Sequence, residues 1–96
     1  MDKKMEYVEK LSAQMVEWDA QIDLLKFKAD SAMNGAAKSE YCKEIDALLS
    51  KRKEAELKLQ GISTASDDMW EELKAGTESI WDETRTALHA AILKIK

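Results

Sequence analysis

The side chains able to act as nucleophiles, bases or metal ligands are few, and none has the neighbours that such chemistry requires. His89 is the single histidine, and no second histidine or cysteine stands three or four residues from it. Position 86 is a threonine, so the Glu-x-x-His pair of di-iron helical bundles is missing. Cys42 has no paired cysteine and no nearby histidine in the sequence that would activate its thiol. We expect a surface or boundary histidine and a small helix-flank residue at these two positions.

Carboxylates are frequent towards the end of the chain, where Asp67, Glu71, Glu78 and Asp82 fall along one face of a helix. Acid–base or metal chemistry needs carboxylates that are buried or that converge. These four lie beside or opposite the tryptophans of the same segment, which is typical of a solvated face. The sequence also lacks a Ser/His/Asp arrangement, a glycine-rich phosphate loop and a Cys-x-x-Cys pair. We therefore expect a protein that is not an enzyme, with no catalytic residue, metal site or cofactor.

The charge of the chain restricts its partners and its setting. A formal net charge of −4 argues against sequence-independent binding of nucleic acid, because that binding needs a concentrated positive field. The only basic run, Lys51-Arg52-Lys53, is typical of a solvated helix face. The N-terminus does not resemble a signal peptide, and no run of about 18 apolar residues exists. These features predict a cytoplasmic setting.

Composition points to helices throughout. The chain has no proline and only three glycines, so little interrupts a helix. Alanine, leucine, lysine, glutamate, methionine and glutamine dominate, and these residues favour the helical state. We expect an all-α protein with a single helical coiled-coil domain over residues 1–96.

An apolar stripe in the first third of the chain is the clearest structural signal. Its members recur at alternating spacings of three and four residues, which is the heptad pattern of a helix that packs against another helix. They are Val8, Leu11, Met15, Trp18, Ile22, Leu25, Ala29, Ala32 and Ala36.

The stripe changes phase around Asn34-Gly35. Counting in sevens from Ala36 predicts an apolar residue at position 43, whereas the next stripe contains Ile45, a shift of two residues. Asn-Gly is a turn signal, yet the flanking sequence is strongly helical. Two architectures follow. One is a long hairpin with a helix over about 2–60, and the alternative is a three-helix bundle with an extra turn at Asn34-Gly35.

A second break is expected at 61–66. If Gly61 adopts the left-handed conformation, Ile62 and Leu57 fall at the positions whose contact closes a Schellman motif. Ser66 would then cap a last helix over about 67–95. Apolar and threonine positions in that helix repeat every eleven residues, which favours nearly straight packing. The repeats are Trp70–Trp81–Ile92, Leu73–Thr84–Ile95 and Thr77–Leu88.

In the long hairpin the first arm would leave its large apolar side chains in water. Burying each of these side chains stabilises the folded state by roughly 1.5–3 kcal/mol. Leaving all of them in water would therefore cost as much free energy as the whole stability of a typical domain. The stripe must therefore be covered, either by a fold-back of the arm or by another chain, and the strict heptads favour another chain. We predict an oligomer or helix-packing interface made of Val8, Leu11, Met15, Trp18, Ile22, Leu25, Trp70, Leu73, Trp81 and Leu88.

Several short segments resemble a family of small bacterial coiled-coil proteins of about one hundred residues, sometimes labelled as stress-response proteins. The most specific element runs from Trp70-Glu71-Glu72-Leu73-Lys74-Ala75-Gly76 to Trp81-Asp82-Glu83. Glu17-Trp18-Asp19-Ala20-Gln21-Ile22-Asp23 adds to the resemblance. The resemblance implies a bacterial cytosolic protein without enzymatic activity and with a link to stress, and it supplies no catalytic residues. The sequence departs from the family pattern at Asn34-Gly35 and in its more apolar C-terminus.

The leading functional prediction is a non-enzymatic structural or interaction protein that self-associates through its heptad stripe or pairs with another helical protein. The alternative is an amphipathic protein that binds a membrane surface through the helix carrying Trp70 and Trp81. The acidic residues around these two indoles weigh against anionic membranes.

Overall fold

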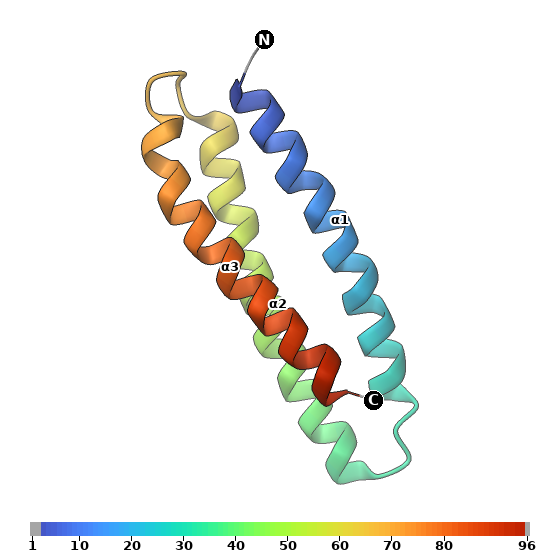
Figure 1. Cartoon of the computed structure of the whole chain (residues 1–96). Coiled ribbons are helices and arrows are strands. Elements are labelled where there is room, and N and C mark those ends of the chain that lie inside the picture. Colours follow the sequence, from blue (N-terminus) through green and yellow to red (C-terminus); the bar gives the residue numbers. More distant parts are fainter. Residues whose placement is uncertain (1–2, 96) are drawn as a thin grey trace.

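The computed structural model describes residues 3–95 and contains three α-helices. They are α1 (Lys3–Asp30), α2 (Gly35–Thr64) and α3 (Trp70–Lys94), and no strand is present in this part of the chain. The all-α prediction is confirmed. The three helices run alternately up and down and form a rod whose principal extents are 52 × 19 × 18 Å (Figure 1). α2 packs closely against both other helices, whereas the backbones of α1 and α3 approach each other less closely.

The helix expected over about 2–60 is interrupted, so the alternative architecture, the three-helix bundle, is the one the chain adopts. α1 ends at Asp30 and α2 begins at Gly35, while residue 2 lies outside the described part of the chain. Asn34 has extended backbone angles, and its side-chain Oδ1 accepts a hydrogen bond from the Ala36 backbone N–H at 2.9 Å. Asn34 therefore caps α2, and the chain reverses direction across residues 31–34 (Figure 1).

The phase change of the apolar stripe gives the physical reason for this reversal. A shift of two residues rotates the apolar face of a helix by about 200°. One straight helix would therefore turn its two apolar stripes to nearly opposite sides, where no single partner helix could cover both. Folding back lets Trp18 of α1 and Ile45 and Leu48 of α2 enter one core.

The second turn lies further along the chain than the sequence predicted. Gly61 lies inside α2, which continues to Thr64, and no described glycine has a positive φ. The Schellman motif at Gly61 was therefore a wrong prediction. The reversal occupies residues 65–69, where the Ser66 carbonyl accepts hydrogen bonds from the Met69 and Trp70 backbone N–H groups at 3.0 and 3.2 Å. Lys4 ties the start of α1 to this turn by donating to the Ala65 carbonyl at 2.9 Å.

The predicted interface residues mostly form the internal core of the bundle. Val8 is half-buried against that core, and the buried members are Leu11, Met15, Trp18, Ile22, Leu25, Trp70, Trp81 and Leu88. Leu73 is the exception, with 42% of its surface exposed. It lies over a shallow depression between α2 and α3 that is also lined by Leu57, Gly61 and Gly76. The heptad stripe is therefore largely covered within the chain.

Candidate interaction surfaces

The titratable residues singled out in the sequence remain apart in the structure. His89 and Cys42 are exposed on different helices, and Asp67, Glu71 and Asp82 are exposed as well. Within residues 3–95, no group of three or more histidine, cysteine, aspartate or glutamate side chains is placed to hold a metal ion. The titratable side chains singled out above therefore do not converge on one point within the described part of the chain.

The three tryptophans lie inside the bundle. The Trp18 and Trp81 rings are tilted by 39° with centroids 4.8 Å apart, which joins α1 to α3. Trp81 also donates from Nε1 to Gln14 Oε1 at 2.6 Å. Trp70 is buried beside Tyr7, with ring centroids 5.7 Å apart. The indoles thus contact other side chains of this fold, and Trp70 and Trp81 are not presented to a lipid surface.

A small depression lies between α1 and α3 next to these rings. It has a volume of about 210 Å³, and its lining includes Tyr7, Gln14 and Glu78. Within residues 3–95 the buried Tyr7 hydroxyl has no well-aligned hydrogen-bond partner, although the Glu78 carboxylate is close enough to influence it. Burial, and secondarily the negative charge of Glu78, raises the pKa of Tyr7. Lys74 Nζ lies 5.1 Å from the centre of the same ring, in a cation–π arrangement.

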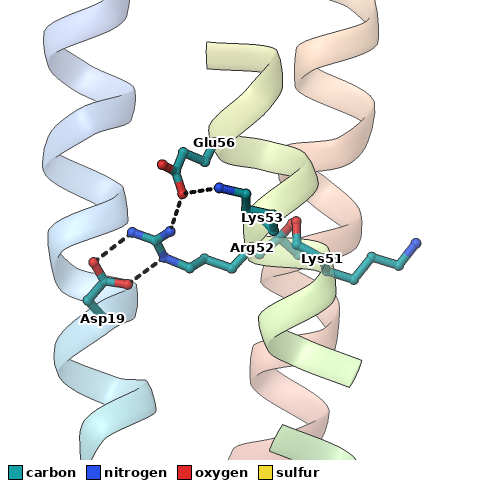
Figure 2. Close-up of polar contacts among 6 residues, drawn as sticks. Asp19, Lys51, Arg52, Lys53 and Glu56 are labelled. Atoms are coloured by element: carbon teal, nitrogen blue, oxygen red, sulfur yellow. Dashed lines mark hydrogen bonds and ion pairs between the residues drawn. The ribbon is translucent and has the colours of Figure 1, made fainter. Parts of the chain in front are cut away.

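The basic run of α2 divides its side chains between the two neighbouring helices. Arg52 reaches α1, where its Nε and Nη2 donate to the two carboxylate oxygens of Asp19 at 2.6 and 3.0 Å (Figure 2). Its Nη1 donates to Glu56 at 2.6 Å. Lys51 points to the other side of α2 and lies 3.4 Å from Glu83 of α3. This run therefore binds within the bundle and does not form a phosphate-binding patch.

The outer side of the α2–α3 pair carries a shallow groove. Gly61 and Gly76 face open space there, since a Cβ added to either would meet nothing within 4 Å. Leu57 and Leu73 are exposed along the groove. Its charged lining consists of Lys58 and of three carboxylates: Glu54 and Glu83, which pair with Lys51, and Glu72. Mixed charges favour no particular partner, so this groove does not identify what covers it.

The outer side of α1 is a more distinctive surface. Five small or apolar residues occupy it in a continuous line, which we call the outer stripe: Ala13, Val16, Ala20, Leu24 and Phe27. Val16 and Phe27 are each 69% exposed and Leu24 is 48% exposed. At 3.6 residues per turn, the outer stripe lies about 180° from the buried stripe of the same helix. α1 therefore has two apolar faces, of which the bundle covers only one.

The charges that flank the outer stripe are mostly acidic. Glu6, Glu9, Glu17 and Asp23 are all exposed and lie within about 60° of the centre of the stripe. The nearest lysines, Lys10 and Lys28, lie about 80° from that centre, on the same side as Glu17, and the other lysines of α1 lie further away. The outer stripe is thus a line of apolar side chains bordered by carboxylates.

Comparison of the chain with protein-family models, with curated proteins and with solved structures finds no match in any of the three. The resemblance to small bacterial stress-response proteins therefore stays a prediction. Among the described helices, none combines the length and the apolar character needed to cross a membrane.

The outer stripe was not predicted from the sequence, although its helical spacing is present there. Val16 and Phe27 are eleven residues apart, a spacing that returns to the same side of a helix after three turns. The stronger heptad stripe on the opposite side obscured this second pattern. Only the burial of the heptad stripe inside the chain identifies the outer stripe as the face left open.

Proposed function

We propose that the protein is a non-enzymatic helical interaction module that binds another helix along the outer stripe of α1. The exposed line formed by Val16, Leu24 and Phe27, directly opposite the buried face, is the observation that supports this proposal. Single exposed apolar residues are normal on a protein surface, but a contiguous apolar patch bordered by polar residues is typical of an interaction site.

The size and shape of the outer stripe suit a helical partner. From Ala13 to Phe27 it extends about 21 Å at 1.5 Å per residue, or about four turns of helix. Ala13 and Ala20 alternate with the larger side chains, which leaves room for the side chains of a facing helix. A helix with apolar residues at spacings of three and four would pack along this line.

This proposal retains part of the sequence-based prediction and changes its location. Association with another copy or with another helical protein remains the proposed mode of action, but the heptad stripe is already used inside the bundle. The bacterial and stress-related setting is proposed from the family resemblance alone, and the cytoplasmic setting from that resemblance together with the charge and hydropathy pattern of the sequence. Membrane binding through Trp70 and Trp81 is less favoured, because both indoles would have to leave the core first.

The test uses the full-length protein and a synthetic helical peptide with a leucine stripe and glutamine at all other positions. We expect changes in amide chemical shifts that are centred on residues 13–27, and loss of these changes in the V16S/F27S variant. The L57S variant is the matched control, because Leu57 is also exposed but lies on the α2–α3 groove. Chemical-shift changes that map to the groove instead, or none at all, would exclude the outer stripe as a helix-binding surface.

Light scattering over a range of protein concentrations tests the same surface for self-association. A dimer that V16S/F27S abolishes and L57S preserves would identify a second copy as the bound helix. A monomer at all concentrations would restrict the proposal to another protein.

A further inference from the structure

The charges around the outer stripe indicate which kind of helix would bind there. We infer that the partner is a basic amphipathic helix, meaning a helix whose apolar stripe is flanked by lysine or arginine, from a protein other than a second copy of this chain. This inference rests on the proposed function and specifies the chemistry of the partner.

The carboxylates are distributed along the outer stripe. Glu9 and Asp23 lie near the two ends of the outer stripe, and Glu17 lies close to its middle. A helix lying on the stripe would place its own flanking side chains beside these carboxylates along the whole contact. Lysine or arginine at those positions would form ion pairs, which speed association and select the partner.

These carboxylates are available to form ion pairs with a partner. Asp19, which lies on the side of α1 that faces α2, is engaged by two donors of Arg52. Glu9, Glu17 and Asp23 take part in none of the ion pairs found in residues 3–95, and all three are exposed. The bundle therefore uses the carboxylate nearest α2 for its own stability and leaves those around the outer stripe open.

The same carboxylates disfavour a second copy of this chain as the partner. Two outer stripes packed face to face would bring together two surfaces whose charges are mostly carboxylates, among them Glu9, Glu17 and Asp23. Like charges in juxtaposition oppose association. The net charge of −4 adds to this repulsion. The same carboxylates disfavour an anionic lipid surface.

The experiment compares three synthetic peptides that share one leucine stripe and differ only in their flanking residues, which are lysine, glutamine or glutamate. Isothermal titration of the full-length protein at low ionic strength should give an affinity about tenfold higher for the lysine peptide than for the glutamine peptide, since several ion pairs of modest strength add up. The glutamate peptide should bind most weakly. The preference for lysine should shrink as salt is added.

Two variants with the same net charge locate the effect. E9Q/D23N removes two carboxylates beside the outer stripe, whereas E40Q/D46N removes two exposed carboxylates of α2. We expect E9Q/D23N to weaken binding of the lysine peptide about three- to tenfold. E40Q/D46N should change that affinity by less than about twofold.

The outcomes separate the inference from the proposed function. Equal binding of the lysine and glutamine peptides, mapped to residues 13–27, would overturn the basic-partner inference and leave the helix-binding function intact. Failure of all three peptides to bind would overturn both. Binding to zwitterionic lipid vesicles without binding to any peptide would also overturn both and would identify the outer stripe as a lipid-binding face. Equal effects of the two charge variants would show that net charge, rather than the outer stripe, governs binding.

Discussion

Arg52 of α2 holds Asp19 of α1 by two nearly parallel N–H···O hydrogen bonds, of 2.6 and 3.0 Å, across the seam between the two helices. Arg52 continues the heptad spacing of Ile45, Leu48, Ala55 and Leu59 in α2, at a position where an apolar residue would be usual. Hydrogen bonding to Asp19 is the main cause that raises the pKa of Arg52, while its partial burial acts in the opposite direction. The pair fixes the register of α1 on α2 at a point about midway along both helices.

The Arg52→Lys variant should be less stable than the wild type by about 1 kcal/mol, because a lysine cannot bond both oxygens of Asp19 and also reach Glu56. The estimate is kept low because Asp19 is half exposed to solvent. Urea unfolding followed by circular dichroism measures the difference. The matched control is Arg85→Lys, since Arg85 pairs with Asp82 on the exposed side of α3 and should tolerate the change. Equal stability of the two variants would mean that the bidentate pair contributes nothing.

The glycines inside the helices provide a second test. Gly61 and Gly76 lie within α2 and α3 without a positive φ, and each faces open space. Replacing either one with alanine should therefore stabilise the protein by about 0.5–1 kcal/mol, because alanine is the better helix former. Thermal unfolding would show a higher midpoint. A lower midpoint for Gly61→Ala would instead indicate that residue 61 ends the helix in the left-handed conformation.

Replacing Asn34, in the turn between α1 and α2, should change stability in opposite directions in the three-helix bundle and in the long hairpin. Asn34→Ala removes the side-chain acceptor of the Ala36 N–H and should destabilise the three-helix bundle by about 1 kcal/mol. Asn34→Asp keeps an acceptor and places a negative charge at the start of α2, so it should preserve stability. In one continuous helix, alanine at position 34 would be stabilising. Chemical denaturation of both variants distinguishes the two cases.

The sequence predicted the helices and most of the core, because burial of an apolar stripe is a local, periodic property. Met15, Trp18 and Ile22 are buried as their heptad spacing indicated, and Trp81 and Leu88 are buried as the eleven-residue repeat indicated. What the stripe packs against depends on where the chain reverses. That choice depends on four residues, 31–34, whose turn and helix tendencies were nearly balanced in the sequence.

The helix end predicted at Gly61 was wrong and the outer stripe was not predicted, each for a specific physical reason. Gly61 was interpreted as a helix end because glycine often adopts a positive φ there, yet the helical residues on either side carry α2 on to Thr64. The outer stripe was missed because an apolar face is recognised as a binding face only when it is known to be uncovered. Which of the two faces of α1 is covered is a property of tertiary packing rather than of sequence spacing.

The Tyr7 hydroxyl gives a prediction that depends on pH. It is buried and has no well-aligned hydrogen-bond partner among residues 3–95, and burial is the main cause that raises its pKa above the usual value of 10.0, with Glu78 adding to the effect. A raised pKa in the folded state means that folding favours the neutral phenol. This contribution to stability is fully present below pH 10 and is lost as the pH rises through the higher pKa of the folded protein.

The Tyr7→Phe variant removes both the ionisable group and the unpaired hydroxyl while keeping the ring beside Trp70. At neutral pH its stability should equal or slightly exceed that of the wild type, because a buried polar group without a partner costs free energy. Above about pH 10 the wild type should lose stability more steeply than the variant. Urea unfolding at pH 8 and near pH 11 measures both effects, and the titration of the other tyrosine and the lysines is common to the two proteins. Parallel loss of stability in both proteins would place the Tyr7 hydroxyl in contact with water rather than in the seam between α1 and α3.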